Sequence, residues 1–180
     1  MDAKTYIKLG DICFSQSDYE NARKLYEKAS EESNGEAFWK LGNLYLFGNG
    51  VEQNYTIAKE YYEKSAQKDY APGYGKLGYI YVEGKGVDVD YAKAIKFLEK
   101  GASKGNAECQ HNLGHLYFCG VGVEKDVNKA IELFKDSAEK NYPHSFYILG
   151  QIYALGEVII PSGLNESHLS HVVVAPIVIG

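Results

Sequence analysis

The hydrophobic positions of this chain follow a pattern that repeats every 36 residues. Within one period, apolar side chains recur at three- and four-residue steps, which is the spacing of one face of a helix. A Leu-Gly pair marks the same point of each period, with its leucine at Leu41, Leu77, Leu113 and Leu149. A fixed period of this length predicts a solenoid of stacked repeats that has no single central core.

A glycine-rich turn separates two predicted helices within each full period. Gly48 can adopt the left-handed conformation that ends a helix, and Gly50 can adopt a second unusual backbone conformation. Asn54, Asp90 and Asp126 stand where the N-cap of the second helix belongs. We therefore expect an all-α chain built from antiparallel helix pairs.

The recurring motif Leu-Gly-x-x-Tyr-x-x-Gly-x-Gly-Val, followed by a cap and then x-x-x-Ala, resembles the Sel-1-like repeat. That family is related to the tetratricopeptide repeat and has a longer turn between its helices, and the resemblance implies a right-handed α/α superhelix. The expected units are a tetratricopeptide-like first repeat at 3–34, full Sel-1-like repeats at 35–70, 71–106 and 107–142, an incomplete repeat at 143–156, and an irregular tail at 157–180.

Composition narrows the classes of partner. The formal net charge is −5 and both signs of charge are mixed along the chain, which argues against a nucleic-acid-binding surface. No apolar run approaches the roughly 20 residues of a membrane span, and the first residues lack the apolar segment of a secretory signal. The three cysteines, Cys13, Cys109 and Cys119, are few and unevenly spaced, as in a reducing compartment. We expect a cytoplasmic protein.

One glycine motif superficially resembles a dinucleotide-binding fingerprint. Residues 73–78 contain Gly-x-Gly-x-x-Gly, but that fingerprint needs a preceding strand and a helix that begins at the glycines. Gly78 is in register with Gly42 and Gly114, well inside the predicted first helix of a repeat. We therefore predict that the motif is structural and that the chain binds no cofactor.

The best metal-ligand candidates are His111 and His115, with Cys119 one turn further along the same predicted helix. A row of ligands along a straight helix cannot converge on one zinc ion, unless His144 or Cys109 contributes from an adjacent turn. No catalytic constellation of serine, histidine and aspartate stands out. We predict no metal site and no catalytic residue.

The remaining candidate is a binding surface on the inner, concave side of the repeats, which the family resemblance assigns to the first helix of each pair. Side chains on this stripe vary between repeats while the packing positions stay constant, and many are aromatic or amide types suited to interfaces. The predicted protein-binding residues are Trp39, Asn43, Phe47, Tyr79, Glu83, His111, His115, Phe118, Tyr147 and Gln151. The same stripe includes Leu46, Gly75, Val82, Cys119, Ala154 and Leu155. In the alternative, Trp39 and Phe47 fill a gap between repeats.

The resemblance implies a non-catalytic adaptor that holds a peptide or helix of another protein, in a setting such as signalling or protein quality control. A second hypothesis is enzymatic, because some cysteine-rich bacterial relatives are linked to β-lactam hydrolysis. Those relatives carry one cysteine pair per repeat, whereas here Cys109 has no cysteine at the partner positions 101–103. A third hypothesis is that the chain is a fragment of a larger multidomain protein.

Overall fold

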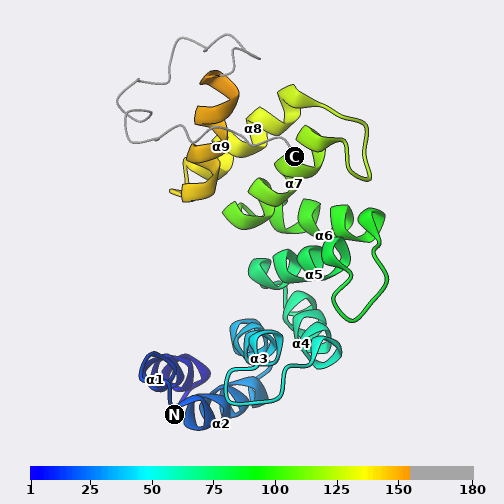
Figure 1. The fold of residues 1–180 in the computed structure, drawn as a ribbon. Coiled ribbons are helices and arrows are strands. Elements are labelled where there is room, and N and C mark those ends of the chain that lie inside the picture. Colours follow the sequence, from blue (N-terminus) through cyan, green and yellow to red (C-terminus); the bar gives the residue numbers. More distant parts are fainter. Residues whose placement is uncertain (155–180) are drawn as a thin grey trace. The chain divides into compact units, whose positions relative to one another are not determined.

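The computed structural model describes residues 1–154, and all the regular structure in this range is α-helical. The tail predicted for 157–180 and the last two residues of the predicted final repeat lie outside the described residues. The helices are α1 (Ala3–Ser15), α2 (Tyr19–Glu31), α3 (Gly35–Phe47), α4 (Tyr55–Gln67), α5 (Ala71–Glu83), α6 (Tyr91–Ser103), α7 (Ala107–Cys119), α8 (Val127–Ala138) and α9 (Pro143–Ala154) (Figure 1).

The turns between paired helices have the predicted construction. Gly48 is left-handed with φ 70°, and Gly50 follows with φ 68°. The side chain of Asn54 then caps α4 by accepting a hydrogen bond from the backbone N–H of Ile57. The backbone N–H of Asn54 also donates to the carbonyl of Tyr45 at 2.9 Å, which closes the turn onto the first helix. Asp90 and Asp126 cap the next two second helices in the same way.

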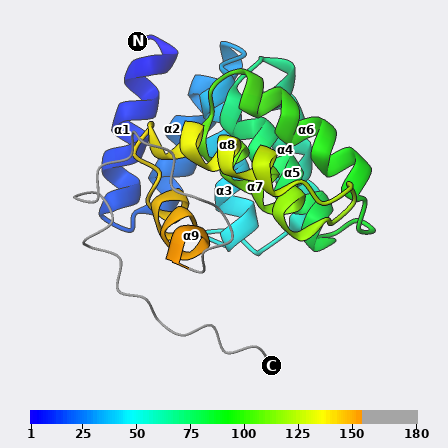
Figure 2. The same ribbon diagram turned by 90° about the horizontal axis from the view of Figure 1, so that it is seen from above.

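The helices belong to two compact units, residues 1–109 and the part of the chain from residue 110 onward. In the first unit the pairs α1/α2, α3/α4 and α5/α6 are hairpins whose helices lie side by side, as both views show (Figures 1 and 2). The first helices also contact one another, α1 with α3 and α3 with α5. Their layer is therefore the inner one of this unit.

Small residues allow the two helices of each hairpin to pack closely. A Cβ atom at Gly42 would lie 2.6 Å from Cε1 of Tyr62, so the fully buried tyrosine ring packs directly on the backbone of α3. Gly78 gives the same access to Leu98 in the next repeat. These contacts explain why glycine follows leucine in these two repeats.

In the second unit, α8 and α9 pack through a cluster of buried side chains that includes Ala130, Phe134, Leu149 and Ile152. A Cβ atom at Gly114 of α7 would lie 2.9 Å from the Phe134 ring, which is the contact that Gly42 makes in the first unit. Residues 1–154 are thus all-α and built from helical repeats of the solenoid class, as the sequence predicts.

Candidate protein-binding surface

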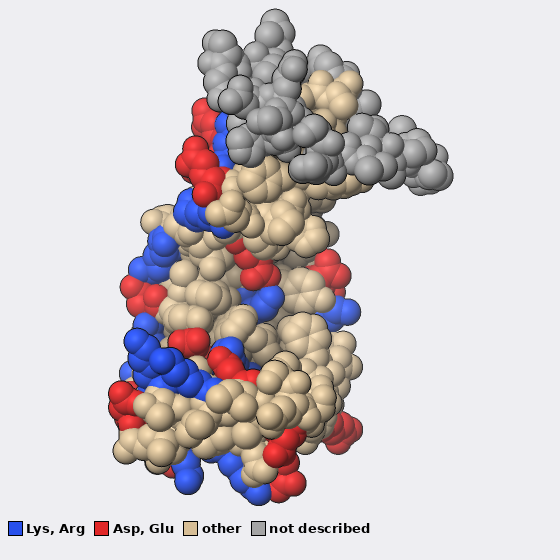
Figure 3. Space-filling view, turned by 90° about the vertical axis from the view of Figure 1, so that its left-hand side faces the viewer, with Lys and Arg blue, Asp and Glu red and all other residues tan. Residues whose placement is uncertain are grey.

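The inner layer of the first unit presents a mostly uncharged surface with a few acidic and basic residues in its middle (Figure 3). Two ion pairs join consecutive first helices on this side. Lys40 Nζ of α3 lies 2.7 Å from Asp11 Oδ1 of α1, and Lys76 Nζ of α5 lies 2.8 Å from Glu108 Oε1 of α7. Since each pair bridges neighbouring repeats, these four residues hold the inner helices together.

A hydrogen bond between the two helices of a repeat occupies some of the inner positions. The hydroxyl of Tyr62 donates to Oδ1 of Asn43 at 2.8 Å. The first repeat has the same bond, from Tyr26 to Asp11 at 2.7 Å. The predicted binding residue Asn43 therefore contributes to the stability of its own repeat.

The next two repeats lack this bond. The residue that corresponds to Tyr62 is Leu98 in α6 and Phe134 in α8, and neither side chain has a hydroxyl. At the position of Asn43 these repeats carry Tyr79 and His115, and both side chains are exposed. The side chains at these two inner positions are thus exposed, and that of His115 contacts the sulfur of Cys119 at 3.7 Å, whereas Asn43 bonds to the second helix of its repeat.

Trp39 is half-buried and packs against the core cluster of the first unit. Its ring lies 6.2 Å from that of Tyr70, and Lys40 Nζ stands 5.6 Å from the indole centroid. The indole nitrogen is buried and has no hydrogen-bond partner among the described residues. Trp39 therefore makes packing contacts within the first unit, and its role in binding a partner stays a prediction.

Phe47 and Glu83 end α3 and α5, and both side chains are exposed. Phe47 has 62 % of its surface accessible, against 38 % for Tyr79. Exposed aromatic residues are common anchors at protein interfaces. Phe47 and Tyr79 are accordingly the strongest candidates of the first unit.

In the second unit, His111 is half-buried and His115 is exposed. Nδ1 of His111 lies 2.9 Å from Oγ of Ser145, whose hydroxyl donates to Ser137 at 2.8 Å. Burial lowers the pKa of His111 to about 4, and the nearby His144 and His115 act in the same direction. His111 is thus a neutral, half-buried residue of the repeat junction.

The other predicted residues of the second unit are also partly buried and partly exposed. Phe118 is half-buried and packs against the core cluster, with Lys125 Nζ 5.6 Å from its centroid. Tyr147 is 41 % exposed, and its hydroxyl accepts a hydrogen bond from Gln151 at 2.9 Å. The exposed members of the predicted set in this unit are therefore His115 and Tyr147.

The expectation of a free side chain at Leu46 is wrong. This leucine is 4 % exposed and belongs to the core cluster, because it lies on the face of α3 that turns toward α4 and α5. Gly75 is buried as well, and a Cβ atom there would lie 3.1 Å from the sulfur of Cys109. Leu155 lies outside the described residues.

The glycine motif, the buried cysteine and the possible metal ligands can each be placed in the structure. Gly73, Gly75 and Gly78 lie inside α5, so the dinucleotide-like motif has a structural role, as predicted. Burial raises the pKa of the Cys109 thiol to about 12, which disfavours the reactive thiolate. Within residues 1–154, no three histidine, cysteine or acidic side chains are grouped as a metal site would need. None of the helices in this range has the length and apolar character that a membrane crossing requires.

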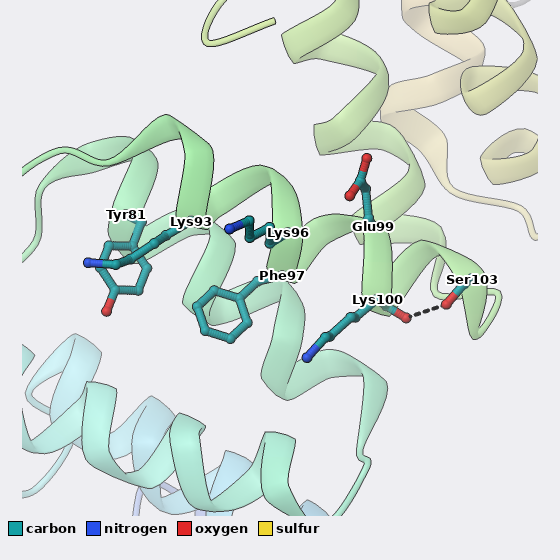
Figure 4. Close-up of a pocket in the computed structure, with 7 residues that line it drawn as sticks. All are labelled: Tyr81, Lys93, Lys96, Phe97, Glu99, Lys100 and Ser103. Carbon is teal, nitrogen blue, oxygen red and sulfur yellow. Dashed lines mark hydrogen bonds between the residues drawn. The ribbon is translucent and has the colours of Figure 1, made fainter.

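The outer face of the first unit carries a cavity of about 630 Å³ that the sequence did not suggest. Its lining residues are Tyr81 of α5 and Lys93, Lys96, Phe97, Glu99, Lys100 and Ser103 of α6 (Figure 4). The rings of Tyr81 and Phe97 stack with 5.8 Å between centroids, and Lys93 Nζ lies 5.3 Å from the centroid of the Tyr81 ring. The feature of the sequence that could have indicated this cavity is the row of lysines on successive turns of α6.

Comparison with known proteins supports the repeat assignment. The family model described as the Sel1 repeat matches residues 6–34, 36–70, 71–106 and 107–142. The first match lies within the unit that the sequence predicts to be tetratricopeptide-like. No curated protein sequence matches the chain.

Several solved structures share the fold. A Sel1 repeat protein from Oxalobacter formigenes is 30 % identical with a TM-score of 0.81, and the match covers 88 % of this chain and 65 % of that one. The protective antigen c5321 from uropathogenic Escherichia coli, which has an SLR fold, is 31 % identical with a TM-score of 0.72, over 93 % and 36 % of the two chains. This chain thus spans less than two thirds of either relative.

A third solved structure bears on the enzymatic alternative. Helicobacter pylori cysteine rich protein B is 24 % identical with a TM-score of 0.59, and the match covers 73 % of this chain and 95 % of that one. At this identity the likeness extends to the fold alone.

Proposed function

The chain belongs to the Sel1 repeat family, and we propose that it is a non-catalytic adaptor that binds a peptide or helix of another protein on its inner face. Sel1 repeats commonly mediate protein–protein interaction. The observation that carries the proposal is the pair of exposed aromatic side chains, Phe47 and Tyr79, on neighbouring first helices of one unit. Such rings offer large apolar contact areas at the centre of an interface.

The inner helices provide a firm platform for a partner. Lys40–Asp11 joins α3 to α1, Lys76–Glu108 joins α5 to α7, and α3 contacts α5 directly, so the first helices of this unit are packed together before binding. A preformed surface reduces the entropy that association would otherwise lose. The second unit has exposed candidates of its own, His115 on α7 and Tyr147 on α9.

Two further features agree with this proposal. Cys13, Cys109 and Cys119 are all free thiols, which suits a cytoplasmic adaptor in a reducing compartment. We do not propose β-lactam hydrolysis, because the residue opposite Cys109 is Gly101 and the cysteine pairing of the cysteine-rich relatives is missing here.

Affinity capture from cells of the source organism tests the proposal. The bait proteins are the unmodified chain, the double variant Phe47→Ala/Tyr79→Ala, and Tyr91→Ala as a control. Tyr91 is 38 % exposed, like Tyr79, but it lies on α6. We expect the double variant to lose partners that the control retains. Equal recovery of the same partners by all three baits would contradict an inner binding face.

A further inference from the structure

The lysines of the outer pocket are not repeated at the equivalent positions of the other full repeats. Lys93, Lys96 and Lys100 stand on successive turns of one face of α6, at steps of three and four residues. The residues one repeat away are Ile57, Glu60 and Lys64 in α4, and Lys129, Glu132 and Asp136 in α8. Among the second helices of these repeats, lysine occupies all three positions only in α6.

The other described residues neutralise only part of the positive charge of these lysines. Lys93 is paired with Asp90, with 3.1 Å between Nζ and Oδ2. Within residues 1–154, Lys96 and Lys100 form no salt bridge, and the pocket lining contains one acidic residue, Glu99. Like charges at these spacings repel each other along a helix. The pocket therefore holds an excess of positive charge on a chain whose net charge is −5.

The floor of the pocket is apolar. The Phe97 ring lies between the Tyr81–Lys93 contact and the side chain of Lys100 (Figure 4). A ligand that fits must therefore offer both negative charge for the ammonium groups and an apolar side chain for the rings. An acidic peptide segment with an aromatic or aliphatic residue has both properties.

The charge of the whole chain distinguishes a peptide from a nucleic acid. A long polyanion would meet the repulsion of a chain with net charge −5, whereas a short segment contacts only the local lysines. Lysine ammonium groups are also point charges without the fork geometry that arginine offers to phosphate. We propose that the outer pocket of α6 is a second docking site, which binds an acidic segment of a partner protein independently of the inner face.

The variant Lys96→Glu tests this site. It introduces the residue that α4 and α8 carry at this position, and it places a carboxylate between Lys93 and Lys100. Because opposite charges at these spacings favour the helix, the melting temperature should not fall. Lys4→Glu, on the exposed surface of α1, makes the same charge change away from the pocket and serves as the control.

The probe is a fluorescein-labelled peptide of alternating aspartate and glutamate with one central phenylalanine, and its affinity is measured by fluorescence anisotropy. We expect Lys96→Glu to bind it at least about tenfold more weakly than the unmodified chain, and Lys4→Glu to bind it within about twofold. Added salt should weaken the binding. A matched peptide with asparagine and glutamine in place of the acidic residues should not bind.

Three results would overturn the proposal. The first is no binding of the acidic peptide by the unmodified chain. The second is equal affinity of the unmodified chain and the Lys96→Glu variant. The third is tighter binding of an oligothymidylate, lost in Lys96→Glu, which would assign the pocket to nucleic acid. None of these results depends on Phe47 or Tyr79, so a failure here is distinct from a failure of the inner-face proposal.

Discussion

The hydroxyl of Tyr62 donates a hydrogen bond of 2.8 Å to Oδ1 of Asn43, and this bond links the second helix of a repeat to the first. Tyr62 is fully buried, so the variant Tyr62→Phe deletes the donor without opening a cavity. We expect the free energy of unfolding to fall by about 1 kcal/mol, the usual net value of such a bond. Urea unfolding followed by circular dichroism measures the change.

Asn43→Ala and the double variant complete a double-mutant cycle for this bond. Asn43→Ala leaves the Tyr62 hydroxyl buried without its acceptor, and this loss should disappear when Tyr62 is already phenylalanine. The double variant should therefore be less destabilised than the sum of the two single variants. Strict additivity would show that the bond contributes nothing to stability.

Gly101 and Cys109 face each other where α6 meets the start of α7. A Cβ atom at Gly101 would lie 3.0 Å from Cβ of Cys109 and 3.3 Å from Cβ of Tyr74, and would also contact the Cys109 sulfur. The variant Gly101→Ala therefore overpacks this junction. We expect a loss of about 1–2 kcal/mol in the free energy of unfolding, measured in urea, despite the better helix propensity of alanine.

The variant Cys109→Ala tests whether the Cys109 side chain causes the overpacking. Removing the sulfur relieves one of the close contacts, so adding Gly101→Ala to Cys109→Ala should cost less than adding it to the unmodified chain. If Gly101→Ala costs the same in both backgrounds, the sulfur of Cys109 is not the limiting contact.

His111 makes stability depend on pH. Its pKa is about 4 in the folded chain because of burial, against an ordinary value of 6.5. The unfolded chain therefore binds a proton first as the pH falls, and the stabilisation present above pH 6.5 is lost as the pH falls toward 4. We expect His111 to lower the free energy of unfolding by about 1–2 kcal/mol between about pH 7 and pH 5.

The variant His111→Gln isolates this effect from the titration of the carboxylates. The difference in unfolding free energy between about pH 7 and pH 5 should be smaller in His111→Gln than in the unmodified chain, whereas His115→Gln, at an exposed position, should keep the full difference. An unchanged pH dependence in His111→Gln would assign the effect to other groups.

Much of the fold follows from the sequence because each repeat carries its own local signals. The left-handed glycine Gly48 and the cap residue Asn54 determine where one helix ends and the next begins. The repeat period then places equivalent helices in register. These signals act over a few residues, so a single sequence suffices to predict them.

The proposed binding surface is harder to predict because the accessibility of its side chains depends on residues that are distant in sequence. Asn43 is engaged because residue 62 is a tyrosine, whereas Tyr79 is open because residue 98 is a leucine. Leu46 is buried by neighbouring helices that its own segment does not specify. The outer pocket is likewise recognised only when α6 is compared with α4 and α8. Lys96 of α6 stands where those helices carry Glu60 and Glu132.

Hydrogen exchange of a complex tests the inner-face proposal most directly. A binding peptide is first selected from a random displayed library with the unmodified chain as bait, and backbone exchange is then compared with and without that peptide. We predict protection in α3 and α5, and a loss of both protection and affinity in Phe47→Ala/Tyr79→Ala but not in Tyr91→Ala. Protection confined to α4 and α6, with full affinity in the double variant, would contradict the inner face as the binding surface.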